Sequence, residues 1–195
     1  MSRVFRPSEA HKLEDPERLK WLPPADVVQQ LELRPGSKVA DIGAGTGYFS
    51  IPIAHAVGSA GQVFAVDLQP EMLSMLREKL SGGDAPVNIS LHQGDASHIP
   101  LPDAKVDLVF FANIWHELDD HEAVLEESRR ILSPAGRIAI LDWRQDRPSP
   151  PGPPQDHRIA MTEITALLMS NGWKATQSAN LGGFSYLVVA TRPVS

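Results

Sequence analysis

Apolar residues along this chain gather in short runs, and between the runs they return at the three- and four-residue spacing of a helix. The runs predict five strands, at residues 38–42, 62–67, 88–92, 106–112 and 137–143. The segments between them predict helices at residues 48–57, 70–80 and 119–132, the last ended by a turn at residues 133–136. Strands separated by helices pair in parallel and carry helices on both faces, so the pattern predicts a doubly wound α/β fold.

The pattern changes near the C-terminus. A helix at residues 160–171 is followed by two strands, 174–180 and 184–191, with only Leu181, Gly182 and Gly183 between them. A connection this short joins antiparallel strands, because a parallel crossover needs a dozen or more residues. We therefore expect a seven-stranded sheet that is mostly parallel and ends in an antiparallel hairpin.

Two segments lie outside this alternation. In residues 1–33, the tetrapeptide from Asp15 to Arg18 predicts a helix start, and a second helix is expected from Pro24 to Leu33. These helices are not needed to complete the sheet, so we expect a helical lid at 1–33 over a main domain at 34–195. Residues 146–155 hold five prolines and predict an extended loop, either a rim of the site or a passive connection.

The stretch 39–47 reads V-A-D-I-G-A-G-T-G and joins the first strand to the first helix. Gly43, Gly45 and Gly47 can adopt backbone angles closed to other residues, which lets a ligand lie against the main chain. A nicotinamide-binding turn would place its third glycine three residues after the second, but position 48 is Tyr. Asp41 would repel a diphosphate and attract an ammonium group. The pattern favours a cationic nucleotide ligand, with a turn that binds nothing as the alternative.

Composition narrows the class of protein. With 195 residues, 42% apolar and 22% charged, the chain is typical of one globular domain. Its formal net charge of −6 and its lack of a long basic run disfavour a nucleic-acid partner. No apolar run approaches the roughly 20 residues that span a bilayer, and the first ten residues lack a signal core, so we expect a cytoplasmic protein. The absence of cysteine excludes disulfides, thiolate metal sites and cysteine nucleophiles.

The stretch 39–47 resembles motif I of the class I S-adenosylmethionine-dependent methyltransferases, whose cofactor has a cationic methionine end and no phosphate. The resemblance covers residues 36–191 and is strongest to the small-molecule enzymes around ubiquinone and menaquinone biosynthesis. It implies a Rossmann-like fold with a terminal antiparallel hairpin, S-adenosyl-L-methionine as cofactor and a small-molecule methyl acceptor. The arsenic-methylating branch, understood to hold arsenite through thiolates, is disfavoured because the chain has no cysteine.

The same resemblance assigns cofactor contacts. Asp67, 20 residues after Gly47, would accept from both ribose hydroxyls, although this spacing also occurs in dinucleotide folds. Asp95 would accept from the adenine amine, and Leu68 with Ile99 would flank the ring; a turn or ordinary core packing is the alternative for these three. The full set expected to bind the cofactor is Asp41, Gly43, Ala44, Gly45, Gly47, Asp67, Leu68, Asp95, Ala96 and Asn113.

Acceptor contacts are expected where the fourth and fifth strands end, because open sheets bind ligands at that edge. The resemblance places His116 against the acceptor, as a general base, an orienting hydrogen-bond partner or a packing residue. Trp115 and Trp143 would wall the acceptor pocket. Arg158 would bind an anionic acceptor or lie on the surface as a helix-start charge.

No metal site is expected. His116 and His121 are five residues apart rather than the four that place two ligands on one helical face. The fourth strand ends in Asn113 rather than in the aspartate that a catechol-type magnesium site uses. Three other functions stay open: an S-adenosylmethionine-binding protein without catalysis, a nicotinamide-dependent oxidoreductase and an interaction module. The atom methylated is also open, and a homodimer is compatible with the sequence.

Overall fold

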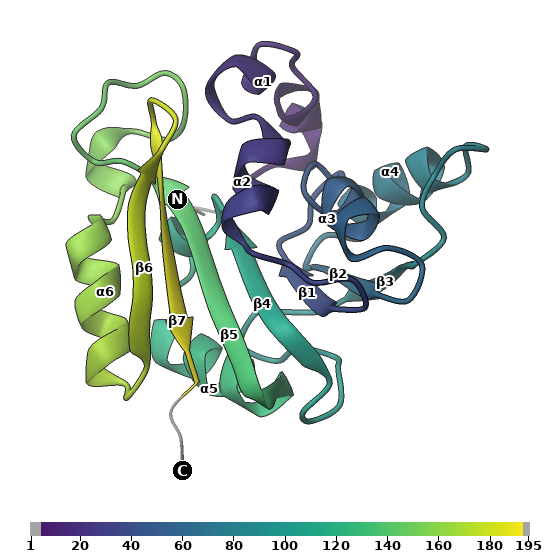
Figure 1. Cartoon of the computed structure of the whole chain (residues 1–195). Helices are drawn as coiled ribbons and strands as arrows, with labels where there is room; N and C mark the ends of the chain where they lie inside the picture. The colour runs from purple at the N-terminus through teal and green to yellow at the C-terminus, as the bar shows by residue number, and fades with distance from the viewer. Residues whose placement is uncertain (1–4, 193–195) are drawn as a thin grey trace.

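A computed structural model describes residues 5–192 of the chain. Its centre is one seven-stranded sheet with the order β3-β2-β1-β4-β5-β7-β6 (Figure 1). The first five strands pair in parallel, and β7 runs antiparallel to both of its neighbours, which confirms the predicted fold class. The strands are β1 Lys38–Ile42, β2 Gln62–Asp67, β3 Ile89–Gln93, β4 Val106–Ala112, β5 Leu132–Trp143, β6 Lys174–Leu181 and β7 Ser185–Thr191.

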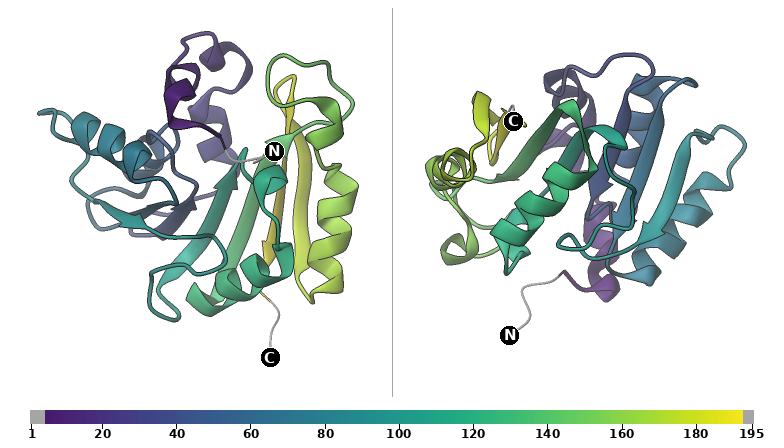
Figure 2. Two further views of the ribbon diagram at one scale, coloured as in Figure 1. Left: turned by 180° about the vertical axis from the view of Figure 1, so that it is seen from behind. Right: turned by 90° about the horizontal axis from the view of Figure 1, so that it is seen from below.

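Helices cover both faces of the sheet (Figure 2). Side chains of α5 and α6 pack in one core cluster, and those of α2 and α3 pack in a second cluster on the opposite face, where α4 also lies. The helices are η1 Pro7–Leu13, α1 Arg18–Trp21, α2 Pro24–Gln30, α3 Ser50–Val57, α4 Pro70–Leu80, η2 Trp115–Glu117, α5 His121–Ile131, η3 Gln155–His157 and α6 Met161–Ser170.

Strand β4 shows why the sheet needs both helical layers. Its neighbours Phe110 and Phe111 point to opposite faces and are both completely buried. Phe110 packs edge-on against Phe49 at a ring-centroid distance of 5.4 Å, and Phe111 packs against Trp115 at 5.1 Å. Burial of such a side chain stabilises the fold by about 1.5–3 kcal/mol. This two-sided burial fixes the end of β4, from which the site described below is built.

Several element boundaries differ from the prediction by one or more residues. Helix α2 ends at Gln30 rather than at residue 33, and α3 begins at Ser50 rather than at residue 48. Strand β5 begins at Leu132, directly after α5, where the sequence predicts a turn. Its pairing with β4 shifts register between Leu132 and Arg137, so the predicted turn residues form an irregularity within the strand. A bulge tolerates Pro134 because the missing N–H of proline is not needed there.

Among residues 5–192, no helix is both long enough and apolar enough to cross a membrane.

Candidate functional site

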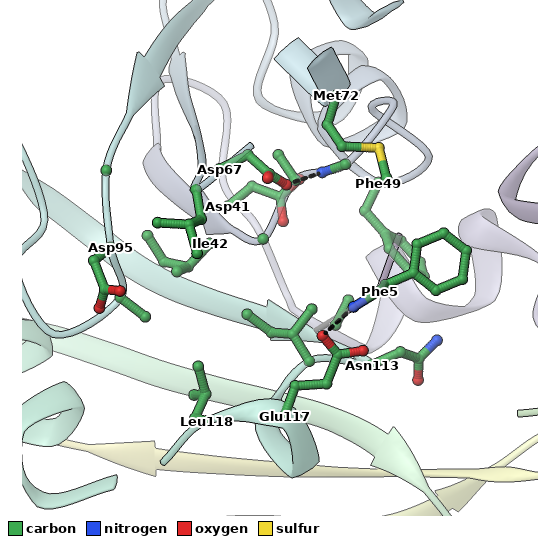
Figure 3. A pocket seen from close by; sticks show the side chains of 18 of the residues that line it. Phe5, Asp41, Ile42, Phe49, Asp67, Met72, Asp95, Asn113, Glu117 and Leu118 are labelled. Atoms are coloured by element: carbon green, nitrogen blue, oxygen red, sulfur yellow. Dashed lines mark hydrogen bonds between the residues drawn. The ribbon is translucent and has the colours of Figure 1, made fainter. Parts of the chain in front are cut away.

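A cavity of about 450 Å³ opens at the carboxyl ends of β1, β2 and β4. Its volume lies within the range of small-molecule binding sites. The glycine-rich turn after β1 forms its floor, and Phe5, Leu13 and Arg18 of the N-terminal segment contribute to its wall. Figure 3 shows Asp41 and Asp67 on one side of this cavity and Glu117, hydrogen-bonded to Phe5, on the other.

The glycine turn needs glycine for two different reasons. Gly43 and Gly45 line the cavity with φ angles of 71° and 54°. A Cβ on Gly43 would come within 2.6 Å of the Ile114 side chain, so the turn and the end of β4 are in close contact. Gly47, at φ 87°, does not line the cavity; a Cβ there would collide with Leu76 of α4. Gly47 therefore has a packing role, and the cofactor contact predicted for it lacks support.

Two carboxylates stand beside this turn. Asp41 at the end of β1 is buried, and its Oδ2 accepts from the Ser50 hydroxyl at 2.5 Å. Burial raises the pKa of Asp41 to about 7, and the nearby charge of Asp67 adds to the shift. Asp67 at the end of β2 accepts from the backbone N–H of Gly45 at 2.8 Å and from that of Gln69 at 2.9 Å. Burial raises the pKa of Asp67 as well.

Asn113 follows β4 and adopts a left-handed backbone with φ 57°. Its N–H donates to the carbonyl of Leu141 at 2.8 Å, which anchors the residue to β5. Asn113 is one of the residues that line the cavity, and its Nδ2 and Oδ1 are buried and have no hydrogen-bond partner among the described residues. Because a buried amide without partners costs free energy, this pair of atoms is suited to a polar ligand group.

The other predicted cofactor residues lie at the same cavity. Ala44, Leu68, Asp95 and Ala96 all line it, and the Leu68 side chain is 49% exposed. Asp95 accepts from the backbone and the hydroxyl of Ser97, which lower the pKa of its carboxyl group. Ile99 is buried in the core and is not part of the cavity wall.

The cavity is strongly acidic. Arg18 is the one basic side chain in its wall within the described part of the chain. Six acidic side chains line the cavity: Asp41, Asp67, Asp95, Glu117, Asp119 and Asp120. A low-dielectric cleft lined by one sign of charge attracts ligands of the opposite sign. The site therefore favours a cationic ligand over a diphosphate.

His116 is buried and does not line the cavity. His116 makes two hydrogen bonds to the carboxylate of Asp142 in β5. Its backbone N–H lies 2.9 Å from Oδ2, and its ring Nδ1 lies 2.8 Å from Oδ1. Burial favours the neutral ring, but the negative charges of Asp142 and Glu117 outweigh it and raise the pKa of His116. The catalytic role predicted for His116 stays a prediction, and its ring faces Asp142 rather than the cavity.

Glu117 is the functional candidate that the sequence analysis missed. It lines the cavity, and its Oε2 accepts from the N–H of Phe5 at 3.0 Å. Burial raises the pKa of Glu117 to about 7, against the opposing effects of the Phe5 N–H and of His116. The available signal was the His116-Glu117-Leu118 sequence itself, but sequence alone does not say which of these side chains turns toward the cavity.

The three predicted acceptor contacts lie away from this cavity. Trp115 is completely buried against Phe111 and stacks on the ring of His121 at 5.0 Å. Trp143 is buried beside Trp21, with ring centroids 5.2 Å apart. These placements give no support to substrate contacts by either tryptophan.

Arg158 is placed differently from both alternatives that the sequence left open, and its contact with an acceptor stays a prediction. Arg158 is 3% exposed as a residue, and its guanidinium donates to backbone carbonyls at 2.8 to 3.1 Å. The acceptors belong to Arg144, Arg147, Pro151 and Pro153. The side chain thus holds the proline-rich loop together, and four of its five N–H donors are used in doing so.

The N-terminal segment is attached around the cavity mouth. Glu14 accepts from the Thr46 hydroxyl and from Lys79 Nζ, the latter at 2.6 Å. Arg18 lies over the ring of Tyr48 at 3.8 Å, an arrangement that adds a cation–π attraction. These contacts tie the segment to the glycine turn and to α4. The segment therefore forms one wall of the site.

Within residues 5–192, no group of three or more His, Asp or Glu side chains is arranged to hold a metal ion.

Comparison with known proteins gives consistent matches. The sequence profile of the family described as "Methyltransferase domain" matches residues 40–140, more than half of the chain. The crystal structure of a SAM dependent methyltransferase from Aquifex aeolicus has 32% sequence identity and a TM-score of 0.90, covering 96% of this chain and 99% of that one.

Among curated proteins, an arsenite methyltransferase of Halobacterium salinarum is 35% identical over 118 residues, which is 60% of this chain and 30% of that protein. A ubiquinone/menaquinone biosynthesis C-methyltransferase of Cellvibrio japonicus is 36% identical over 111 residues, 57% of this chain and 45% of that protein. The chain therefore spans less than half the length of these curated relatives.

Proposed function

The chain belongs to the S-adenosylmethionine-dependent methyltransferase family, and from this membership we propose that it transfers a methyl group from S-adenosylmethionine to a small-molecule acceptor. The observation that carries the proposal is the acidic cavity over the glycine turn, with Asn113 in its wall and the Asn113 amide lacking a hydrogen-bond partner among the described residues. A cofactor that carries an ammonium and a sulfonium group, and no phosphate, matches that charge.

The residues present fit this cofactor. Asp67 offers carboxylate oxygens to a diol, and Asp41 offers a negative charge to an ammonium group. Asn113 supplies a donor and an acceptor that have no partner within residues 5–192. When bound, the cofactor supplies an electrophilic methyl group, so the protein needs chiefly to align an acceptor with it and exclude water.

We infer an uncharged small acceptor. The names of the relatives point to a quinone-type ring in one case and to arsenite in the other. This chain has no cysteine with which to hold arsenite as a thiolate complex. Four backbone carbonyls accept from the five N–H donors of Arg158, so the cation predicted to bind an anionic acceptor is engaged in the loop. Apolar wall residues, among them Phe5, Ile114 and Leu118, suit a hydrophobic molecule.

We also infer that residues 1–33 act as a lid over a main domain at 34–195. The contacts of Phe5, Glu14 and Arg18 around the cavity mouth support this division. Residues 1–4 and 193–195 of these two units lie outside the described residues. A homodimer and a cytoplasmic location stay predictions; light scattering on the purified protein tests the first.

Transfer of a labelled methyl group tests the proposed activity. The purified protein is incubated with S-adenosylmethionine deuterated at the methyl group and with a small-molecule cell extract. Mass spectrometry is expected to find S-adenosylhomocysteine together with a product that has gained the labelled methyl. The Asp67→Ala variant serves as the control and should form neither. A protein that binds the cofactor but forms no S-adenosylhomocysteine with any extract would be a binding protein rather than an enzyme.

A further inference from the structure

We propose that Glu117, supported by the buried pair His116 and Asp142, is the group that faces the reacting centre and accepts the proton released by the methyl acceptor. This inference rests on the proposed function and assigns one residue to its chemistry. The sequence pattern had directed that role to His116.

The short helix η2 turns its three residues in three directions. Trp115 enters the core, and His116 turns to Asp142. Glu117 reaches the cavity wall, together with the next residue, Leu118. Because an acid–base group must come within hydrogen-bond reach of its substrate, the cavity-lining carboxylate is better placed than the imidazole behind it.

His116 stands directly behind this carboxylate. Its Nδ1 is held by Asp142 at 2.8 Å, and its Nε2 lies 3.8 Å from Glu117 Oε1. Two bonds to one carboxylate fix both the backbone and the ring of His116, which leaves Nε2 directed at Glu117. A protonated imidazole there stabilises the ionised form of Glu117. His116 is thus a positioning residue that acts through Glu117.

Charges on several elements act on Glu117. On its own turn, His116 favours the ionised carboxylate. The Phe5 N–H of the N-terminal segment also favours it, whereas Asp142 of β5 and Asp67 of β2 disfavour it. Asp119 and Asp120, after η2, lie in the same cavity wall. Burial is the largest influence, and it makes the carboxylate a stronger proton acceptor than an exposed glutamate.

The proposed step is balanced. The acceptor atom loses one proton to the Glu117 carboxylate as it forms its bond to the methyl carbon, and the electron pair of the broken carbon–sulfur bond stays on sulfur. The substrate class that follows is a neutral molecule with an acidic O–H, N–H or C–H. An acceptor that arrives already as an anion would be repelled by the same carboxylate.

The affinities of S-adenosylmethionine and S-adenosylhomocysteine, measured by calorimetry, test whether Glu117 faces the reacting centre. This measurement needs no methyl acceptor. The two differ by the methyl group and by the positive charge on sulfur, so any effect on the ammonium, ribose or adenine end cancels in the ratio of their affinities. An ionised carboxylate near the sulfonium should favour the charged probe. Glu117→Gln keeps the shape and an oxygen for the Phe5 N–H, while Glu122→Gln removes an equal charge from the exposed start of α5.

We expect Glu117→Gln to lower the preference for S-adenosylmethionine over S-adenosylhomocysteine by about tenfold or more, and Glu122→Gln to change it less than about twofold. In the parent protein the preference should rise between about pH 6 and pH 8 as Glu117 ionises. His116→Asn should move the midpoint of that rise to higher pH, because the partner that favours the carboxylate is lost.

An unchanged preference in Glu117→Gln would overturn the placement of Glu117 while leaving the proposed function intact. A preference that does not vary with pH in the parent protein would overturn it equally, even if the variant failed to fold. If neither probe binds the parent protein, the proposed function itself fails.

Discussion

The backbone N–H of Phe5 donates to Glu117 Oε2 at 3.0 Å, although 112 residues separate the two in sequence. The carbonyl of Phe5 accepts from Gln69 Nε2 at 2.8 Å. One residue of the N-terminal segment is therefore tied both to the turn after β4 and to the residues after β2. A bound molecule would lie beneath this connection, and its entry and release would require Phe5 to move.

Deletion of residues 1–16 removes Phe5, Leu13 and Glu14 but keeps Leu22, which is buried in the core. We expect a folded domain that still binds the cofactor and turns over an identified acceptor poorly, because water reaches the cavity. Amide hydrogen exchange at residues 43–47 should become faster than in the parent protein. Unchanged exchange and full turnover would refute a lid.

Asp67→Ala should weaken S-adenosylmethionine binding by ~2–4 kcal/mol, since charged hydrogen bonds to two hydroxyls are lost. Stability should also fall, because Asp67 accepts from the N–H groups of Gly45 and Gln69. Asp67→Asn retains one acceptor oxygen and should lie between the parent and Asp67→Ala in both measurements. Calorimetry and urea unfolding measure the two effects, and wild-type affinity in the alanine variant would contradict the ribose assignment.

Asp41→Asn is expected to raise stability and lower cofactor affinity in the same protein. Burial raises the pKa of Asp41 from 3.8 to about 7, so between these values the folded state holds a proton that the unfolded chain has released. The free energy of unfolding of the parent therefore decreases as pH rises through this window.

Asp41→Asn cannot ionise, so its free energy of unfolding does not decrease with pH in this window. The variant should therefore be more stable than the parent by ~2 kcal/mol near neutral pH, and equally stable below the pKa of the unfolded carboxyl. Its S-adenosylmethionine affinity should be lower at neutral pH and no longer increase with pH. Thermal unfolding and calorimetry across pH check both arms. If the parent and Asp41→Asn were equally stable at all pH values, ionisation of Asp41 would not destabilise the folded state.

Arg158→Ala should destabilise the fold by ~2–4 kcal/mol, because four backbone carbonyls, three of them in the proline-rich loop, lose their donor. Arg158→Lys should recover only a small part, since one ammonium cannot reproduce the planar set of donors. Exposed Arg147 provides the control, and Arg147→Ala should change stability by less than ~0.5 kcal/mol. If Arg158→Ala were as stable as the parent but lost activity, a direct acceptor contact would be favoured instead.

Most of the fold was predictable because periodicity reports burial directly. Strands β1, β2 and β4 lie at the predicted residues, and the short Gly182–Gly183 connection required the terminal hairpin. The start of β5 was missed because Pro134 and Gly136 are turn residues by local propensity, whereas pairing of Leu132 with Val106 extends the strand.

The site residues were predictable where a sequence motif determines the backbone. They were not predictable where the orientation of a side chain decides which residue lines the cavity. Asp41 and Asp67 are strand-end residues, so their place follows from the strands themselves. In η2, a rotation of one residue decides whether His116 or Glu117 meets the cavity, and that rotation depends on Asp142, 26 residues away. Phe5 and Arg158 belong to segments without periodicity, so their contacts depend on tertiary packing that no local pattern encodes.

Calorimetric titration of the parent protein with S-adenosylmethionine and with nicotinamide adenine dinucleotide tests which cofactor the cavity binds. The acidic cavity, with Asp41 beside the glycine turn, should bind S-adenosylmethionine and bind the dinucleotide at least about a hundredfold more weakly, because the ionised acidic side chains of its wall repel a diphosphate. Dinucleotide binding as tight as that of S-adenosylmethionine, or no binding of S-adenosylmethionine at all, would show that the cavity is not an S-adenosylmethionine site.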